Sequence, residues 1–487
     1  MKSPFHCIAI DMGAATIRVL LGTIENSRIQ YEEVYRFKNE IKFIDGHDRW
    51  DVDFILEHII TGINIAIEKS NNSVESLGID SWGVDFTMLD EKGNLLETPV
   101  AYRDSRTSGM EEKWQTLMSK KETFERTGIN FYIFNSLFQL FSIKNSDILK
   151  QASKIVFMPN YIYYKLTRQI ANELTISSTS QLLDAGSTGW EEKVLMSCGV
   201  DSKQLGTVVM PGNILGQVNH QAVNSSQIKA VNVCSHDTAS AIAAIPAEKS
   251  GFAFISTGTW CIMGVESQTP VLTEFALNKG FTNERGYGNT YRVLKNILGL
   301  WLVQGLQKTL PEKFSFDEME KLAFDEKYAG YLINPEDELF FNPESMYEAF
   351  KQFFTKTKQG IPGGPGFYIK CAYDSLCLSF KQCIDELDQM FASKIEVMHM
   401  IGGGCQSEYL CKTTAGFCNK KLVAGPVEGA GIGNIMVQGI AMGKIKNLTE
   451  GRKMVRNSFE IKEYYPGTNN EKIKELEKKF MELKNNN

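Results

Sequence analysis

The sequence has no apolar stretch long enough to cross a membrane and no Cys-x-x-Cys pair. Its longest apolar stretches, such as Asn296 to Leu306, fall short of the ~20 residues that a membrane-spanning helix needs. The ten cysteines are scattered, and few histidines lie near them. We therefore expect no membrane span and no structural zinc site.

Long runs of lysine or arginine are also missing, apart from a mixed-charge segment near the C-terminal end. The chain has 52 Lys and Arg against 58 Asp and Glu, a net charge of −6. Proteins that bind nucleic acid or anionic membranes usually carry a basic face, so neither is expected as a partner. The first residues lack the apolar region of a signal peptide, which predicts a cytoplasmic protein with reduced thiols.

Glycine and proline are too few for a low-complexity chain, at 40 and 13 of 487 residues. Hydrophobic residues make up 43% of the sequence, enough for sizeable cores. A chain of this length suggests two large domains or about three smaller ones.

What the sequence does contain is a repeated strand–turn–strand pattern. Residues 7–10 and 16–23 are apolar and flank a Gly-bearing turn, which predicts a hairpin. Residues 252–256 and 260–265 flank a second such turn. Residues 54–69 have helical spacing, and this alternation indicates an α/β fold. The repeat favours a duplicated domain with a cleft between the copies; coincidence is the alternative, because such hairpins are common.

Two further glycine-rich segments precede predicted helices. The triplet at residues 402–404 lies between strand-like residues 396–401 and a helical stretch from about Ser407. Glycines there let backbone N–H groups approach a phosphate, although a tight turn has the same pattern. Residues 426–433 lead into a second helix, and residues 470–484 predict a charged amphipathic helix.

Two aspartates follow apolar strands, where a carboxylate can serve phosphoryl transfer. Asp11 lies beside the first Gly turn and can reach a hydrated Mg²⁺ ion; a turn-forming aspartate is the alternative. Asp237 lies between a strand and a small-residue helix, where it can accept the proton of an alcohol; a helix N-cap is the alternative. His236 is either a ligand or a structural hydrogen-bonding residue.

Three other segments combine aromatic and polar groups that suit a sugar. Trp82 is followed by Gly83-Val84-Asp85, with a core tryptophan as the alternative. The string Tyr-Arg-Asp-Ser-Arg at residues 102–106 fits a sugar site or a surface salt-bridge cluster. Asn296 has apolar neighbours, where a buried amide needs partners.

Together these strings resemble the FGGY family of carbohydrate kinases. The segments that carry the resemblance are residues 11–18, 50–53, 78–86, 99–107, 235–240, 256–260, 291–297, 402–406 and 424–428. The Gly turns occur in every actin-like ATPase. The strings Trp-Gly-Val-Asp-Phe at 82–86, Tyr-Arg-Asp-Ser-Arg at 102–106 and Arg-Val-Leu-Lys-Asn at 292–296 resemble the branch that acts on L-rhamnulose.

The resemblance implies two actin-like (ribonuclease H-like) α/β domains with a central ATP/sugar cleft. We place the sugar-binding domain at residues 1–245 and the ATP-binding domain, ending in the amphipathic helix, at residues 246–487. The implied reaction transfers the γ-phosphate of ATP, with Mg²⁺, to the 1-hydroxyl of L-rhamnulose, in a monomer or homodimer. The alternatives are another ketose, such as L-fuculose or L-xylulose, and a non-catalytic sugar sensor.

The resemblance also implies roles residue by residue. Asp237 takes the position of the catalytic base, and Asp11 that of the aspartate that helps to hold Mg²⁺. The positions that bind sugar are Gly83, His236, Asp237, Thr238 and Asn296. The positions that bind ATP are Ala14, Ala15, Thr16, Ile17, Arg18, Thr259, Gln304 and Gly402.

The loop at residues 13–18 departs from the family pattern, which commonly runs Gly-Ala-Ser-Ser-Gly-Arg. Here Ala15 lacks the hydroxyl of the first serine, and Ile17 replaces a glycine. Because isoleucine does not readily adopt a positive φ, we expect ordinary β-like backbone at Ile17.

Overall fold

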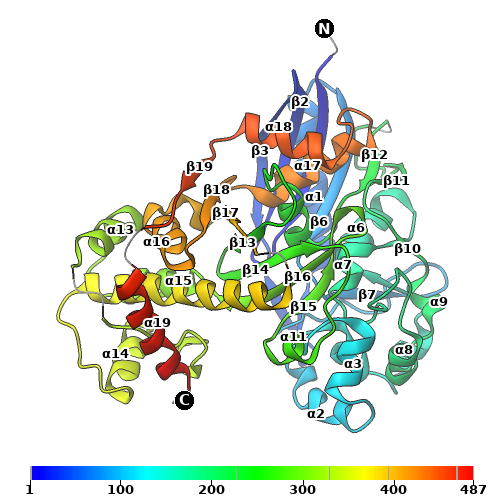
Figure 1. Ribbon diagram of the computed structural model, residues 1–487. Coiled ribbons are helices and arrows are strands. Elements are labelled where there is room, and N and C mark those ends of the chain that lie inside the picture. The colour runs from blue at the N-terminus through cyan, green and yellow to red at the C-terminus, as the bar shows by residue number, and fades with distance from the viewer. Residues whose placement is uncertain (1–2, 226, 328–329, 393, 468–469, 486–487) are drawn as a thin grey trace. The chain divides into compact units, whose positions relative to one another are not determined.

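The computed structural model describes residues 3–225, 227–327, 330–392, 394–467 and 470–485, and the chain forms two compact units (Figure 1). Unit 1 consists of Met1–Glu248, Glu266–Val293 and Gly429–Ser458. Unit 2 consists of Lys249–Val265, Leu294–Glu428 and Phe459–Asn487. The chain first passes from unit 1 to unit 2 after residue 248 and later returns twice to unit 1. The division into residues 1–245 and 246–487 stays a prediction.

The centre of unit 1 is a six-stranded sheet with the order β11-β12-β6-β1-β2-β3. Its strands are β1 (Phe5–Met12), β2 (Thr16–Glu25), β3 (Arg28–Lys38), β6 (Val74–Ser81), β11 (Asn213–Gln217) and β12 (Lys229–Asn232). The predicted hairpin is confirmed as the antiparallel pair β1–β2. Strand β6 runs parallel to both β1 and β12, so these three strands end at the same edge of the sheet.

Three helices build the core against this sheet. The predicted helix at 54–69 is confirmed as α1 (Val52–Lys69), which begins after the N-cap Asp51 and buries an isoleucine face against β1–β3. Helix α17 (Gly429–Ala441) packs on β1 and β6, and α10 (Asp237–Ala243) packs on α17. The helices approach closely, since a Cβ on Gly433 would lie 1.8 Å from the Ser240 carbonyl oxygen.

A second core of unit 1 lies under shorter elements, around Phe138, Phe157 and Ile176. The remaining strands of unit 1 are β4 (Ile41–Ile44), β5 (His47–Trp50), β7 (Phe86–Leu89), β8 (Lys154–Phe157), β9 (Asn172–Glu173), β10 (Val208–Val209) and β15 (Thr282–Arg285). Its remaining helices are α2 (Met110–Gln115), α3 (Lys120–Thr127), α4 (Ser136–Ser142), α5 (Asp147–Gln151), α6 (Met158–Thr167), α7 (Leu174–Ser178), α8 (Glu192–Cys198), α9 (Ser202–Leu205), α11 (Glu274–Asn278) and α18 (Leu448–Ser458).

Unit 2 contains most of a seven-stranded sheet with the order β15-β16-β14-β13-β17-β18-β19. Its strands are β13 (Ala253–Thr257), β14 (Trp260–Ser267), β16 (Tyr291–Leu298), β17 (Val397–Gly402), β18 (Lys421–Ala424) and β19 (Lys462–Tyr464). Strand β13 forms an antiparallel hairpin with β14 and runs parallel to β17, as β1 does with β2 and β6. The repeated sequence pattern therefore corresponds to a repeated topology.

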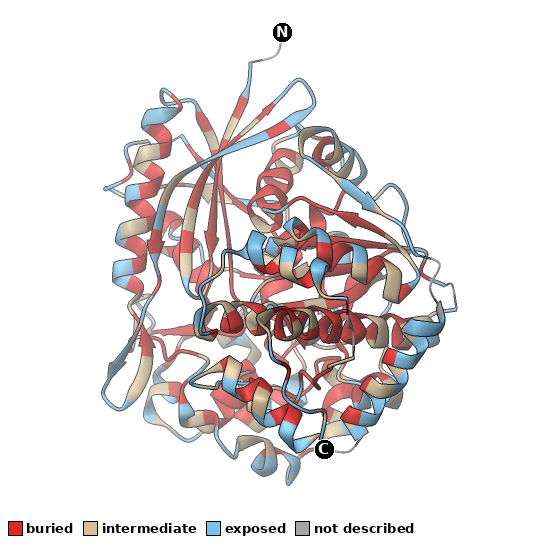
Figure 2. Ribbon diagram, turned by 90° about the vertical axis from the view of Figure 1, so that its left-hand side faces the viewer, coloured by how far each residue is buried: buried red, intermediate tan, exposed pale blue. Residues whose placement is uncertain are grey.

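The helices of unit 2 are α12 (Trp301–Thr309), α13 (Phe316–Asp325), α14 (Met346–Lys356), α15 (Pro365–Met390), α16 (Glu408–Cys418) and α19 (Asn470–Asn485). The predicted helices after residue 407 and at 470–484 are confirmed as α16 and α19, and α19 lies beside α15 (Figure 1). Exposed residues gather on outward helix faces and loops (Figure 2). Within the described ranges, no helix combines the length and apolar character that crossing a membrane requires. All ten cysteines are buried free thiols.

Candidate active site

Three aspartates of unit 1 lie at the edge where β1 and β6 end. Asp11 on β1 and Asp80 on β6 are paired in register. Ser81 follows Asp80, and its N–H donates to the Ser235 carbonyl at 2.9 Å, which brings Asp237 to the same edge. Burial and the other two aspartates raise the pKa of Asp80 well above its usual range. The arrangement brings three carboxyl groups to one point of the sheet.

The first Gly turn joins β1 to β2 next to these carboxylates. The Gly13 N–H donates to the Thr16 carbonyl at 3.1 Å, and a Cβ on Gly13 would lie 2.6 Å from that oxygen. Ile17 is a buried β2 residue opposite Met12, so the expected β-like backbone is confirmed. Arg18 forms an ion pair with Asp11. Burial raises the pKa of Asp11, and the Arg18 guanidinium opposes this rise.

Asp237 is held through one of its two carboxylate oxygens. Oδ1 accepts the Thr238 N–H at 2.5 Å and the Thr238 hydroxyl at 3.1 Å, and it lies 3.4 Å from His236 Nε2. In the described part of the chain, no hydrogen bond or ion pair involves Oδ2, and the side chain is 32% exposed. Asp237 begins α10 and His236 is the N-cap, so the interpretation of Asp237 as an N-cap was wrong.

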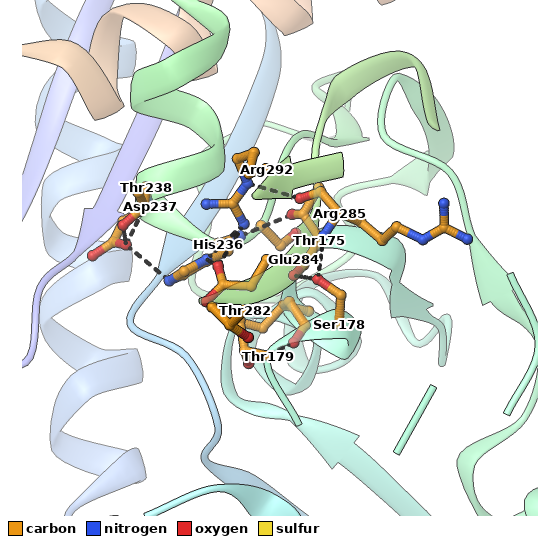
Figure 3. A network of polar contacts seen from close by, with 12 residues as sticks. Thr175, Ser178, Thr179, His236, Asp237, Thr238, Thr282, Glu284, Arg285 and Arg292 are labelled. Atoms are coloured by element: carbon orange, nitrogen blue, oxygen red, sulfur yellow. Dashed lines mark hydrogen bonds and ion pairs between the residues drawn. The ribbon is translucent and has the colours of Figure 1, made fainter. Parts of the chain in front are cut away.

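His236 joins Asp237 to an ion pair between the fully buried Arg292 and the partly buried Glu284 (Figure 3). Its Nδ1 lies 3.1 Å from Arg292 Nη2 and 3.3 Å from Glu284 Oε2, and the latter two atoms are 2.9 Å apart. Both ring nitrogens therefore have polar partners, which supports a hydrogen-bonding role for His236 in this structure.

A buried glutamate fixes the backbone that leads to Asp237. Glu173 Oε2 accepts the Ser235 N–H at 3.1 Å and the Thr175 hydroxyl at 2.7 Å. The Thr175 hydroxyl oxygen in turn accepts the His236 N–H at 3.1 Å. Burial raises the pKa of Glu173 to about 7, and these hydrogen bonds oppose the rise.

The Trp-Gly-Val-Asp segment forms a strained turn over a buried carboxylate. Asp85 Oδ2 accepts the indole N–H groups of Trp50 at 2.6 Å and Trp82 at 2.9 Å, so Trp82 is a core residue. Val84 has φ +69°, which is unusual for a β-branched residue, and its N–H donates to Thr179 Oγ1 at 3.0 Å. A Cβ on Gly83 would lie 3.0 Å from the same oxygen.

The Tyr-Arg-Asp-Ser-Arg string is divided between the interior and the surface. Asp104 is buried and accepts the Asp48 N–H at 2.9 Å. Arg106 donates to Gln139 Oε1 at 2.6 Å, and the Gln139 amide donates to Asp85 Oδ1 at 3.2 Å. Arg106 therefore supports the turn at residues 82–85 through Gln139, and Asp104 holds the backbone of Asp48.

Three of the predicted ATP residues share one corner of unit 2. Strands β13 and β17 end together, with Thr257 paired with Gly402. The N–H of Trp301, the first residue of α12, donates to the Thr259 carbonyl at 3.2 Å. Gln304 lies one turn further along α12. The other five predicted ATP residues, 14–18, belong to unit 1.

The predicted sugar residues are likewise divided between the units. Gly83, His236, Asp237 and Thr238 belong to unit 1, and Asn296 lies on the unit 2 part of β16. Asn296 is half-buried, so the expectation of a buried amide was wrong.

Two family models match nearly the whole chain. The "FGGY family of carbohydrate kinases, N-terminal domain" covers residues 6–244, and the corresponding C-terminal domain covers residues 253–442. The chain belongs to the FGGY family of carbohydrate kinases. As a member of this family it is an ATP-dependent sugar kinase, and the resemblance stated from the sequence is confirmed.

Curated relatives of this FGGY kinase include the rhamnulokinase of Bacillus subtilis, 36% identical over 94% of this chain and 95% of the relative. The rhamnulokinase of Lactiplantibacillus plantarum is 37% identical over 95% of each chain. Similar solved structures include gluconate kinase from Lactobacillus acidophilus, with TM-score 0.81, 15% identity and coverage of 99% and 97%. Plasmodium falciparum glycerol kinase with ADP has TM-score 0.81, 15% identity and coverage of 99% and 98%. These structures confirm the two-domain α/β fold.

Sequence reasoning did not assign roles to several polar residues of this FGGY kinase. Asp80 ends an apolar strand, as Asp11 does, so the same signal was available for it. Arg292 begins one of the branch-specific strings. Glu173 and Glu284 follow no chemical motif, and only the tertiary structure reveals their contacts with residues 235 and 236.

Proposed function

We propose that this FGGY kinase transfers the γ-phosphate of ATP to the 1-hydroxyl of L-rhamnulose, giving L-rhamnulose 1-phosphate and ADP. The substrate is supported by rhamnulokinases at 36% and 37% identity over almost their full length. The catalytic part of the proposal depends on the one-sided arrangement of Asp237, with Oδ1 occupied and Oδ2 without a partner in the described residues.

In this proposal Asp237 is the general base. Its Oδ2 accepts the proton of the sugar hydroxyl while that oxygen attacks the γ-phosphorus. One P–O bond forms to the sugar, and the bond between the γ-phosphorus and the ADP oxygen breaks. The contacts of Thr238 and His236 with Oδ1 fix the plane of the carboxylate, which reduces the motion needed to reach the transition state.

The residues near Asp237 fit a hydrated Mg²⁺ ion. Asp11, Asp80 and Asp237 bring three carboxylates together with the guanidinium of Arg18. The described residues contain no group of three His, Cys, Asp or Glu side chains suited to hold a metal directly. Because Mg²⁺ keeps several waters, we propose that Asp11 holds it through water. When bound, Mg²⁺ would neutralise phosphate charge.

We further propose that the turn at residues 14–18, together with Thr259, Gln304 and Gly402, binds ATP. Gly83, His236, Thr238 and Asn296 are proposed to bind the sugar. The backbone N–H groups of Ala14 and Ala15, in the turn between β1 and β2, are suitable phosphate donors. We assign the sugar to the domain at residues 1–245 and ATP to the domain at residues 246–487. A cytoplasmic location and a monomeric or homodimeric state stay predictions.

A coupled ADP assay with a panel of ketoses tests this function. We expect kcat/KM to be highest for L-rhamnulose, with L-fuculose and L-xylulose lower, and ³¹P NMR to show a phosphate ester at position 1. Strong preference for another ketose would mean that this ketose, and not L-rhamnulose, is the substrate. Sugar binding without phosphorylated product, under Mg-ATP, would favour the non-catalytic sensor instead.

A further inference from the structure

Glu284 and Arg292 lie on the side of His236 opposite Asp237 (Figure 3). Glu284 is on β15 and Arg292 is on β16. Arg292 Nη2, Glu284 Oε2 and His236 Nδ1 are mutually 2.9 to 3.3 Å apart. Neither Glu284 nor Arg292 has a role in the proposed transfer of the phosphoryl group.

The ion pair is rigidly held. Arg292 is fully buried, and its Nε donates to the Arg285 carbonyl at 2.9 Å. The Arg285 N–H donates to the Ser178 hydroxyl at 2.8 Å, which fixes the strand beside Glu284. Burial alone would raise the pKa of Glu284, but Arg292 and His236 lower it to about 2. At neutral pH the glutamate is therefore charged, and its Oε2 lies 2.9 Å from the Arg292 guanidinium as an ion pair.

This pair offers His236 Nδ1 a partner in either protonation state. When Nδ1 has no proton, the Arg292 guanidinium donates to it; when Nδ1 is protonated, the Glu284 carboxylate accepts from it. The other ring nitrogen, Nε2, then faces Asp237 Oδ1 at 3.4 Å. The orientation of the His236 ring is thus determined at Nδ1, on the side away from Asp237, by two residues that are far from it in the sequence.

We propose that Glu284 and Arg292 are positioning residues that hold the His236 ring against Oδ1 of Asp237, so that Oδ2 is presented to the acceptor hydroxyl. This inference rests on the proposed role of Asp237. It adds that removal of the Glu284 charge acts on catalysis through His236 alone.

A double-mutant cycle tests the proposal. Glu284→Gln keeps the side-chain size, and we expect it to lower kcat about tenfold through loss of orientation, with KM for ATP unchanged. In the His236→Ala background, we expect Glu284→Gln to change kcat less than twofold, because the imidazole ring that Glu284 positions is absent. A tenfold loss that persists in that background, or parent kcat for Glu284→Gln, would overturn the proposal.

Glu266→Gln is a matched control for loss of a partly buried ion pair. Glu266 pairs with Arg452 at 2.7 Å in the same unit and is 16% exposed, against 15% for Glu284. We expect it to lower Tm comparably but to change kcat less than twofold. If it lowers kcat as much as Glu284→Gln does, loss of stability explains the effect and the proposal is wrong.

A readout without turnover separates this inference from the proposed function. The chain has six histidines, so the ¹⁵N resonances of the His236 ring can be assigned by their loss in His236→Ala. We expect Glu284→Gln to move those resonances and Glu266→Gln to leave them in place. If they move although L-rhamnulose is not phosphorylated, the substrate proposal fails and the positioning contact stands. Unmoved resonances would overturn the positioning role.

Discussion

Gly402 and Thr257 are paired across β13 and β17 so closely that a Cβ on Gly402 would lie 2.3 Å from the Thr257 carbonyl oxygen. Gly402 also has φ +86°, a conformation that favours glycine. The Thr257 hydroxyl oxygen accepts the Gly404 N–H at 2.9 Å and so ties the glycine triplet to the end of β13. The triplet is therefore a fixed structure rather than a loose turn.

Gly402→Ala is expected to lower the free energy of unfolding by about 2 kcal/mol, because it adds both backbone strain and a clash. We also expect a higher KM for ATP. Gly403→Ala is the matched control, since among the described residues no atom beyond Gly403 and its two chain neighbours lies within 4 Å of its Cβ position. Urea unfolding and ATP kinetics measure both variants. Equal effects of the two substitutions would contradict this account.

Asp237→Asn is expected to lower kcat by ~10² or more, because an amide cannot accept the hydroxyl proton. The asparagine carbonyl can still accept from Thr238, so the local structure and sugar binding should persist. Steady-state kinetics measure the first effect, and calorimetric titration with L-rhamnulose measures the second. Turnover at the parent rate would show that another group is the base.

Local patterns in the sequence were sufficient to predict single elements of this fold. The alternation of apolar residues predicted the β1–β2 and β13–β14 hairpins, and helical spacing predicted α1 and α19. Each of these signals lies within about 20 neighbouring residues, and over such a length the periodicity of apolar residues is enough to distinguish a helix from a strand. Family resemblance added the order of the two domains.

The meeting of distant residues could not be predicted from such patterns. Asp11 and Asp80 become neighbours only because β6 pairs in parallel with β1, and Arg292 reaches His236 across 56 residues of sequence. The return of residues 266–293 and 429–458 to unit 1 also depends on tertiary packing. The sequence around Trp82 suits an aromatic residue that packs on a sugar. Its burial and its hydrogen bond to Asp85 are visible only in the structure.

Arg18→Met is expected to shift the pH profile of the enzyme. Burial raises the pKa of Asp11 and Arg18 opposes this, so removal of the guanidinium raises that pKa further. Asp11 then takes up its proton at higher pH, and the acid limb of kcat/KM should move to higher pH. Profiles between about pH 5 and 9 measure the limb.

The control for this shift is Arg36→Met on the neighbouring strand. Arg36 is opposite Arg18 across β2–β3, but it is more exposed and pairs with Glu33. We expect its acid limb to coincide with that of the parent. A limb that does not move in Arg18→Met would mean that Asp11 does not control the profile.

Asp85→Asn is expected to remove a pH dependence of stability. Burial raises the pKa of Asp85 from its ordinary value of 3.8 to about 6, although Trp82, Trp50 and Gln139 donate to it. A carboxyl with a raised pKa in the folded state binds its proton more tightly there than in the unfolded chain. Its contribution to stability is therefore complete below about pH 4 and is lost as the pH rises through about 6.

The free energies of unfolding of parent and Asp85→Asn, measured by urea titration at about pH 4.5 and 7, test this sign. The parent should lose stability relative to the variant between the two values, by at most about 3 kcal/mol. Comparing the two proteins at each pH removes the contribution of the other carboxyls. A difference that stays constant would mean that the indole and amide donors balance the cost of burying the Asp85 charge. A difference that grows in favour of the parent toward pH 7 would mean that they outweigh it.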